Sequence, residues 1–483
     1  MGHQTSSDSC QTIMTGRVEM SLRNFFIFNS QYGKKEGEEH QKIFFYHPAD
    51  IDLNTKVKDV GLCEAIIHFT NNFTSSDGCQ ALNTQKTSQI FYLPEKDFWM
   101  VMTLNAPWET KTRDGNEYTE YRGGDMHTTI YRAVLRQAYQ MFRLFAGTFE
   151  MNFVGETEAE KIENLKKKLE VFYSKYLLTI KLKSCDILDV VQSIQYLPLE
   201  RMLFLRIHTF INMIEETFPR IQKCIFLYND QLVWSEVSPS DLYSIYEYLT
   251  GTLFQKAKET ELKGGSLKRS YSLEGSRHGS FITGPESPDS QGKAPKVFVT
   301  SGSDLRSYYM VVYRALTASI CLLVNAESPP TEDFYSELHS FMGPQLSSIA
   351  SKIGESYAKS ATGNPAKIGN EQDCASPKYL FINELTLRHT GTVHVHPQRP
   401  NTPALPLFVT NLIADLYDSK RDLQGKYEET VVKALNDYWV VKRTSNWREF
   451  YVIVNNNKAT LLDITNEANK LFEQQITNVF FEK

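Results

Sequence analysis

Residues Lys223 to Leu253, KCIFLYNDQLVWSEVSPSDLYSIYEYLTGTL, predict a β-hairpin followed at once by an amphipathic helix. Aromatic residues alternate along the first strand, and Asn229-Asp230 tolerate the left-handed backbone of a tight turn. The partner strand then returns through Trp234, and Ser238 is suited to cap the helix that follows.

The same order of two strands and a helix is predicted near the N-terminus. The strands are LRNFFIFNS (22–30) and KIFFYHP (42–48), and the helical pattern is Leu62, Ile66, Phe69 and Phe73. A strand-strand-helix opening that is used more than once favours a series of similar domains over a single enzyme fold.

Length and composition predict about three domains. The 483 residues exceed what one hydrophobic core usually serves. Hydrophobic residues make up 41% of the chain and aromatic residues 12%, which is enough for packed cores. The net charge of −5 gives no overall attraction to nucleic acid, so a nucleic-acid binder is disfavoured.

The cysteines indicate a reducing compartment. There are seven, an odd number, and none forms a C-x-x-C pair, so neither a disulfide framework nor a zinc site is indicated. The longest apolar runs, such as FWMVMTLNAPW (98–108), are shorter than the roughly 20 residues that a membrane span needs. No signal peptide opens the chain, and we expect a soluble, cytosolic protein.

The first six residues, MGHQTS, fit the pattern for myristoylation of Gly2. A disordered polar tail explains them equally well, and one acyl chain alone anchors a protein only marginally.

The first domain continues with strands in TQKTSQIFYLP (84–94), FWMVMTLNAP (98–107) and YTEYR (118–122). Two half-buried helices are predicted next, from apolar stripes at helical spacing. The stripes are Ile130, Val134, Ala138, Met141 and Phe145 in the first helix, and Leu165, Leu169, Phe172 and Tyr176 in the second.

The middle domain contains a predicted mobile insertion at residues 255–295, which are rich in Gly, Ser and Pro. An amphipathic helix at 203–218 precedes the central hairpin and suits either neighbouring domain. Strands resume in KVFVTS (296–301), SYYMVVY (307–313) and SICLLVN (319–325). A long helix from Phe334 to Ile353 follows, in which we expect Gly343-Pro344 to produce a kink.

The third domain follows a loose stretch at 359–377. Its expected elements are a strand in KYLFINELTLRH (378–389), a helix through Leu405 and Leu416, a hairpin in DYWVVKRTSNWREFYVIVN (437–455) and a closing helix through Leu461 and Leu471. The fold class is therefore α/β (α+β), with mainly antiparallel sheets flanked by helices.

No motif for catalysis or for a cofactor is found. The phosphate-binding loop, the nucleophile elbow, H-E-x-x-H and the dinucleotide fingerprint are all absent from the sequence. His394 and His396 lie on one side of a predicted strand, but no carboxylate or thiol is nearby, so a solvated edge is favoured over a metal site. Lys166-Lys167-Lys168 is typical of the exposed face of a helix.

Six segments resemble one known family in combination. They are VGLCEAI (60–66), TQK (84–86), FWMVM (98–102), LYNDQLVWS (227–235), GPQL (343–346) and DYWVV (437–441). Together they resemble the Ccz subunit of the Mon/Ccz complex, in order from about Phe25 to the C-terminus.

The resemblance implies three tandem longin domains. We expect a tail at 1–21, the first longin domain at 22–180, the second at 181–358 with the insertion, a linker at 359–377 and the third at 378–483. It also implies pairing with a Mon subunit as a guanine-nucleotide exchange factor for the late-endosomal Rab GTPase, with a third, scaffold-like subunit in animals. Such a factor promotes endosome maturation and the fusion of autophagosomes and vacuoles or lysosomes.

In this family the first longin domains of both subunits form the GTPase-binding surface. The candidates here for contacts with the Rab or the partner subunit are Glu64, Thr84, Gln85, Lys86 and Trp99. Each also has a plain structural interpretation: Glu64 as a solvated helix position, 84–86 as a loop and Trp99 as core.

Met100 and Met102 are candidates for the interface with the Mon subunit, because interface centres favour Met and aromatic side chains. A place in the core of the chain explains them as well. No covalent chemistry is expected, because an exchange factor only binds its GTPase.

The insertion contains a basic window, in which Lys263, Lys268, Arg269 and Arg277 face only one acid, Glu274. We expect weak attraction to anionic or phosphoinositide-bearing membranes, which a second contact from Tyr271, Leu273, Phe281 or Ile282 would reinforce. Phosphorylation of Ser270 or Ser272 would reverse the attraction. A linker without a partner explains the composition equally well.

An alternative function is a longin-type trafficking adaptor or tether without exchange activity. A longin SNARE is disfavoured, because sustained heptads followed by a membrane anchor are absent from the sequence. A hydrolase would need a nucleophile and a base that no motif supplies.

Overall fold

The computed structural model describes residues 13–73, 79–113, 116–123, 126–180, 182, 185, 187–262, 278–284, 294–363, 377–393, 405–419 and 427–480. The chain forms two compact units, one of Met1–Phe142 with Thr148–Val191 and one of Arg143–Gly147 with Gln192–Lys483. Helix α4 (Ile187–Val191) therefore lies in the first unit. We had expected the second domain to begin at residue 181.

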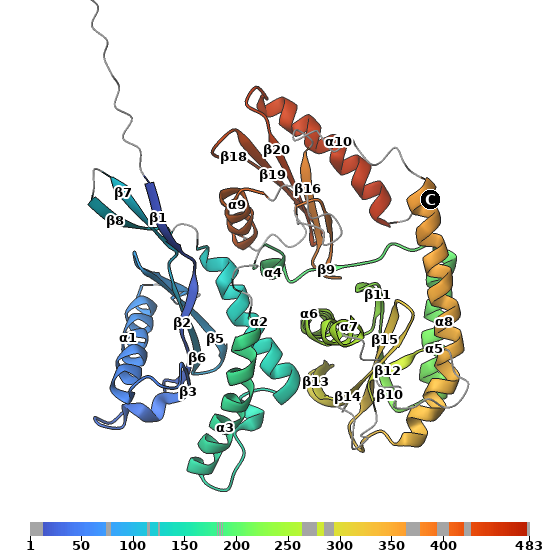
Figure 1. Cartoon of the computed structure of the whole chain (residues 1–483), viewed down its shortest axis with the longest axis horizontal. Helices are drawn as coiled ribbons and strands as arrows, with labels where there is room; N and C mark the ends of the chain where they lie inside the picture. The colour runs from blue at the N-terminus through green and yellow to red at the C-terminus, as the bar shows by residue number, and fades with distance from the viewer. Residues whose placement is uncertain are drawn as a thin grey trace, which may run out of the picture. The chain divides into compact units, whose positions relative to one another are not determined.

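The first domain is built on a five-stranded antiparallel sheet. Its order is β3 (Ile43–His47), β2 (Ser21–Asn29), β6 (Phe98–Asn105), β5 (Thr87–Glu95) and β4 (Ala81–Asn83). Helix α1 (Leu53–Asn71) lies on one face, and α2 (Thr128–Ala146) and α3 (Glu158–Tyr176) lie on the other (Figure 1). The short helices η1 (Glu39–Lys42), η3 (Glu150–Asn152) and η4 (Leu177–Thr179) complete the domain.

Strand β2 is buried on both faces, which explains its unbroken run of apolar residues, Phe25 to Phe28. Phe26 and Phe28 pack with Val60 of α1 in one cluster. Phe25 faces the other side, where its ring lies 5.1 Å from that of Tyr173 of α3. The predicted stripes of α2 and α3 are confirmed as buried at their centres, at Val134 and Ala138 and at Leu165 and Leu169.

The apolar pattern of Leu62, Ile66, Phe69 and Phe73 correctly indicates a helix, but this is not the side of α1 that packs on the sheet. Leu62, Phe69 and Phe73 are 53%, 65% and 73% exposed, and the core side of α1 consists of Val60, Cys63 and Ile67 instead. The helix carries two apolar stripes of similar spacing, and periodicity alone cannot tell which of them packs on a sheet.

The N-terminal segment also differs from the expected tail at 1–21. β1 (Ile13–Val18) pairs with β7 (Trp108–Arg113), which pairs in turn with β8 (Asn116–Tyr121) in a three-stranded antiparallel sheet. The composition of residues 13–18 does not predict a strand. They form one because they pair with β7, which lies far away in the sequence. β8 matches the strand predicted near YTEYR.

The second domain is built around the sheet β11 (Gln231–Ser235), β10 (Ile221–Tyr228), β15 (Ala318–Asn325), β14 (Asp304–Ala315) and β12 (Ser280–Thr283), with β13 (Lys296–Ser301) also paired to β14. The central hairpin is confirmed, because Asn229 and Asp230 both adopt positive φ, 50° and 65°. Helix α6 (Pro239–Glu247) begins after Ser238 as predicted, but the Ser238 side chain makes no capping hydrogen bond. The helix continues through a π-helical turn (Tyr248–Leu253) into α7 (Phe254–Leu262).

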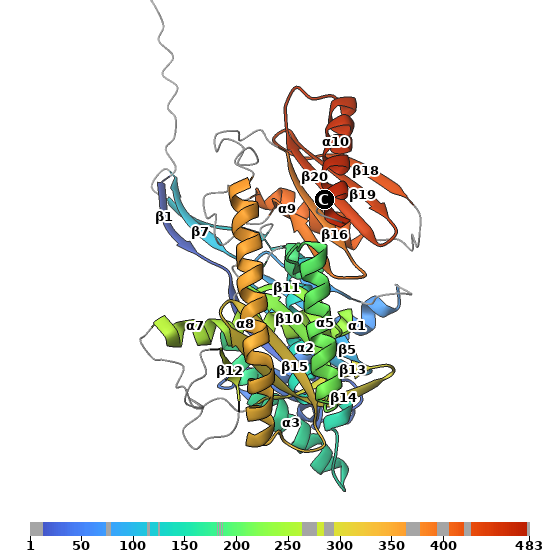
Figure 2. The same ribbon diagram turned by 90° about the vertical axis from the view of Figure 1, so that its right-hand side faces the viewer.

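Two long helices, α5 (Arg201–Thr217) and α8 (Glu332–Gly363), lie side by side on this domain (Figure 2). Phe210 of α5 and Leu346 of α8 share one core cluster with the sheet residues Phe226 and Leu322. The helix near 203–218 thus belongs to the second domain. Helix α8 runs continuously through Pro344, so the helix does not stop at Gly343-Pro344.

The insertion at 255–295 is not structureless throughout, because α7 extends to Leu262 and β12 pairs with β14. Phe281 of β12 packs against Tyr313 and Tyr335, with ring centroids 4.9 and 5.0 Å away. Phe281 is therefore a packed side chain, and its expected role as a membrane contact is wrong. Tyr271 and Leu273 lie outside the described residues.

The third domain has the sheet order β18 (Glu428–Lys433), β19 (Tyr438–Ser445), β20 (Arg448–Asn455), β16 (Lys378–Asn383), β17 (Arg388–Gly391) and β9 (Ile194–Gln195). Helices α9 (Leu407–Asp418) and α10 (Leu461–Phe480) accompany it. The β19–β20 hairpin is confirmed, with positive φ at Asn446 and Trp447.

Two expectations for this domain are corrected. The single strand 378–389 is divided into β16 and β17 by a turn, in which Leu387 has a φ of 57°. β9 was expected in the second domain, but it pairs in parallel with β17. His394 and His396 lie outside the described residues.

Glu95, at the end of β5, joins three parts of the first domain. One carboxylate oxygen accepts hydrogen bonds from the Tyr139 hydroxyl at 2.7 Å and from the Phe149 amide at 2.5 Å. The other oxygen accepts from the Glu150 amide at 3.0 Å, at the start of η3. Hydrogen bonds to an ionised group contribute more than neutral ones.

We expect Glu95→Ala to lower the free energy of unfolding by about 2 kcal/mol, because two backbone amides and a hydroxyl lose their acceptor. Urea unfolding of the purified chain measures the change. Glu163→Ala is the matched control, because Glu163 is 65% exposed and pairs only with Lys167. Equal unfolding midpoints for the two variants would contradict the role of Glu95.

Candidate functional site

Glu64 lies on α1 and is half-buried rather than solvated. Its carboxylate is 2.5 Å from the Lys42 ammonium and 4.0 Å from the His68 ring. The pair with Lys42 ties the short helix η1 to α1. Glu64 therefore has a structural partner within the chain, and it borders the exposed side of the helix.

Thr84, Gln85 and Lys86 form the exposed connection between β4 and β5. The Thr84 hydroxyl oxygen accepts a hydrogen bond from the Thr87 amide at 2.9 Å, which closes the turn. The Lys86 ammonium lies 5.6 Å from the centre of the Tyr121 ring. This turn is accessible and held in shape by its own contacts.

Trp99, Met100 and Met102 lie on β6 and divide between the two faces of the sheet. Trp99 packs against the α1 cluster and is half-buried. Met100 and Met102 are 0% and 1% exposed. The assignment of both methionines to a partner interface is wrong, because they lie in the chain's own core, and aspartate at either position would test folding rather than binding.

The outer face of α1 is a surface that the pattern analysis missed. Leu62 and Phe69 of α1 form an exposed apolar stripe with Phe73, which lies just beyond the end of the helix, and the rings of Phe69 and Phe73 are 5.0 Å apart. Gly61 lies beside Leu62, and a Cβ atom there would meet nothing within 4 Å. Contiguous exposed apolar groups commonly mark a protein interface. The signal was present in the sequence as the helical pattern of Leu62, Ile66, Phe69 and Phe73, which does not specify which side of the helix is buried.

The basic window cannot be placed. Lys263, Lys268, Arg269 and Arg277 lie outside the described residues, as do Ser270 and Ser272. No helix in the described part of the chain is long and apolar enough to cross a membrane.

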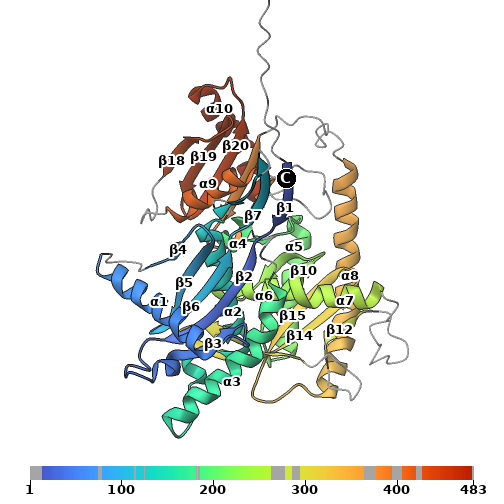
Figure 3. The ribbon, with the colours of Figure 1, turned by 60° about the vertical axis from the view of Figure 1, so that its left-hand side comes forward.

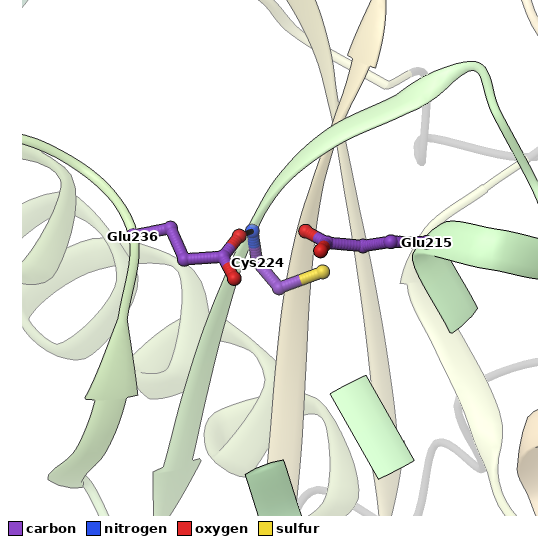
Figure 4. A group of neighbouring side chains, drawn as sticks. All are labelled: Glu215, Cys224 and Glu236. Atoms are coloured by element: carbon purple, nitrogen blue, oxygen red, sulfur yellow. Dashed lines mark hydrogen bonds between the residues drawn. The ribbon is translucent and has the colours of Figure 1, made fainter. Parts of the chain in front are cut away.

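One group of three potential ligand side chains occurs among the described residues, in the second domain. Glu215 of α5, Cys224 of β10 and Glu236 after β11 bring their ligand atoms within 4.8 Å of one another. Figure 4 shows the Cys224 side chain between the two carboxylates. The Cys224 amide donates to Glu236 at 3.1 Å.

Protons, rather than a metal, explain this acidic cluster. Burial, together with a hydrogen bond to Glu236 and the charge of that residue, raises the pKa of Glu215 to about 7. Burial also raises the pKa of the Cys224 thiol well above its ordinary value. A thiol must lose its proton to bind a metal ion, so the raised pKa opposes coordination. We interpret the cluster as two carboxyl groups that share a proton.

This cluster predicts a stability that depends on pH. The ordinary pKa of Glu215 is 4.5 and its folded value is about 7, so the folded state retains a proton that the unfolded state releases between these values. The stabilisation is complete below about pH 4.5 and is lost as the pH rises to about 7. Glu215→Gln removes the titration, so we expect the variant to be more stable than the wild type at pH 8 by about 1 kcal/mol, allowing for solvent screening.

Thermal unfolding at pH 5 and pH 8 measures the effect, with the exposed neighbour Glu216→Gln as the control. At pH 5 the two variants and the wild type should unfold together. The same change in midpoint from pH 5 to pH 8 in Glu215→Gln and in the wild type would rule out proton sharing.

Comparison with known families identifies all three domains. The first longin domain of INTU, CCZ1 and HPS4 matches residues 22–147, the Intu longin-like domain 2 matches 221–343, and the Intu longin-like domain 3 matches 374–471. The fold is therefore three tandem longin-like domains.

Relatives match nearly the whole chain. The Vacuolar fusion protein CCZ1 homolog of Xenopus tropicalis is 38% identical over 476 residues, which cover 96% of this chain and 98% of the relative. The protein of the same name from Nematostella vectensis is 39% identical over 467 residues, with 95% and 98% covered. That of Dictyostelium discoideum is 26% identical over 462 residues, with 93% and 96% covered. The chain belongs to the family of CCZ1 vacuolar fusion proteins.

Proposed function

We propose that this chain is one subunit of a heteromeric guanine-nucleotide exchange factor that activates the late-endosomal Rab GTPase. The partners are a Mon subunit, the Rab and, in animals, a third scaffold subunit. The observation that carries the proposal is the exposed apolar stripe of α1 in the first longin domain of a chain whose relatives are named as vacuolar fusion proteins. The complex would act at late endosomes, lysosomes or vacuoles, and autophagosomes.

An exchange factor needs a shaped surface rather than a reactive group. It binds the nucleotide-free GTPase more tightly than the nucleotide-loaded form. Its binding therefore lowers the affinity of the GTPase for the nucleotide by the same factor. The exposed stripe Leu62, Phe69 and Phe73, beside the ion pair of Glu64 with Lys42, supports a surface of this kind. An apolar centre with a polar rim is the usual composition of a protein interface.

The surface assigns roles that differ from those suggested by the sequence. Phe69 and Phe73 would carry the contact with the partner subunit, because aromatic side chains are enriched at the centres of protein interfaces. The exposed turn of Thr84, Gln85 and Lys86 follows the edge strand β4 and would contact the GTPase. Trp99 would support α1 from within the sheet.

We expect the complex with the Mon subunit to accelerate release of a fluorescent nucleotide from the late-endosomal Rab, and the isolated chain to lack this activity. Phe69→Asp with Phe73→Asp should weaken binding to the Mon subunit at least tenfold, because two buried aromatic contacts are each worth about 2 kcal/mol. Size-exclusion chromatography and nucleotide release measure the two effects. Val171→Asp, at a residue of α3 that is 64% exposed, is the matched control.

Full exchange activity of the isolated chain would overturn the shared site. A stable complex without any exchange activity would favour an adaptor or tether. A variant that forms the complex as well as the Val171→Asp control does would remove α1 from the interface.

The basic window is proposed as the membrane-binding element. Replacing Lys263, Lys268, Arg269 and Arg277 by Gln should leave exchange in solution unchanged and weaken exchange on anionic vesicles, by up to about 1 kcal/mol for each charge. Substitution leaves Phe281 in its packing against Tyr313, which a deletion through that residue would remove. Equal activity on vesicles at low salt would reduce the segment to a linker.

A further inference from the structure

The open edge of the first sheet carries a groove that nothing above uses. Strand β3 is the outermost strand, pairs with β2 on one side and has no described strand on the other. A groove of about 510 Å³ follows this edge, lined by Ile43 to Tyr46, by Leu53 and Lys56 of α1, and by Lys166, Lys167 and Glu170 of α3. Figure 3 shows β3 between these two helices.

Two lysines flank the groove without a carboxylate partner among the described residues. The Lys56 ammonium lies 5.4 Å from the centre of the Tyr46 ring and donates to the Ala49 carbonyl at 2.8 Å. The Lys166 ammonium lies 5.5 Å from the centre of the Phe44 ring. Burial lowers the pKa of Lys166, since its charge is partly desolvated. Neighbouring Lys167 differs, because it pairs with Glu163 at 2.7 Å.

The strand itself lacks one common protection of an exposed edge, although its register against β2 shifts between Ile27 and Phe28. Natural edge strands discourage pairing with other chains by carrying Lys, Glu or Pro within the strand. β3 reads Ile43-Phe44-Phe45-Tyr46-His47 and contains none of these. The positive charges come from the flanking helices instead, one on each face of the sheet.

We propose that β3 binds an extended acidic peptide segment of a partner protein as an additional strand. Main-chain hydrogen bonds to the open edge would supply affinity, as in other proteins that bind peptides by strand addition. Successive side chains of a strand point to opposite faces, so adjacent acidic residues reach Lys56 on the α1 side and Lys166 on the α3 side. The ligand class is thus an extended segment with two neighbouring carboxylates between apolar residues.

The test uses a fluorescein-labelled peptide TVEEVT and fluorescence anisotropy with the full chain at low salt. We expect saturable binding that Lys56→Glu and Lys166→Glu each weaken at least tenfold, because each loses a partly desolvated charge pair worth roughly 1.5–3 kcal/mol. The matched control is Lys175→Glu, which makes the same charge change at an exposed position of α3 outside the groove.

Two further peptides separate strand addition from attraction between charges. A TVKKVT peptide should not bind. N-methylation of alternate backbone nitrogens of TVEEVT should abolish binding in one of the two possible registers, since it removes the N–H donors that face β3.

Three results would overturn the proposal. One is equal binding by Lys166→Glu and Lys175→Glu, and another is full binding by peptides methylated in either register. The third is no peptide binding together with flotation on vesicles of 30% phosphatidylserine that Lys56→Glu and Lys166→Glu abolish, which would assign the groove to a lipid surface.

Discussion

The first domain depends on a sheet that is covered on both faces. Residues Phe25 to Phe28 are all fully buried, so neither side of β2 can meet solvent or a partner. One helix covers one face and two helices cover the other. What remains accessible is limited to the outer sides of these helices, the turns and the two edges of the sheet, and the candidate surfaces of this domain are found there.

This arrangement explains why the candidate sites of the first domain are binding surfaces on helices, turns and sheet edges rather than clusters of reactive side chains. In such a domain, apolar side chains fill the space between the sheet and its helices. Little room is left in the interior for reactive polar groups. Two half-buried carboxylates have structural partners: Glu95 accepts hydrogen bonds from two amides and a hydroxyl, and Glu215 of the second domain lies beside Glu236. Activity that depends on shape and charge at the surface suits a fold of this kind.

Turns and helix starts were predictable from the sequence. Which of two similar apolar faces of a helix is buried was not. The Asn229-Asp230 turn followed from the conformations that these residues tolerate, and the helix after Ser238 followed from its apolar spacing. Helix α1 has two apolar stripes, and only packing against β2 decides that Val60, Cys63 and Ile67 are buried. The pattern identified the helix correctly and left open which of its sides is buried.

Contacts between segments that are far apart in the sequence were the second feature that could not be predicted. The strand β9 joins a sheet whose other strands begin about 180 residues later, and no local signal in Ile194-Gln195 indicates this. The acidic cluster likewise gathers Glu215, Cys224 and Glu236 from a helix and two strand ends. Among the candidate site residues, the turn at 84–86 is exposed, as the sequence suggested. Met100 and Met102 lie in the core, which the sequence could not decide because an apolar strand fits a core and an interface equally well. The basic window lies outside the described residues.

Gly61 gives the exposed side of α1 an additional property. Glycine within a helix costs about 1 kcal/mol relative to alanine, and nothing in the chain occupies the space that a methyl group would fill. The absence of a side chain bares the helix backbone beside Leu62 and permits another main chain to approach it within van der Waals distance. Gly61 therefore lowers the intrinsic stability of the helix and leaves a small depression on its exposed side, into which a side chain or backbone segment of a second protein can fit.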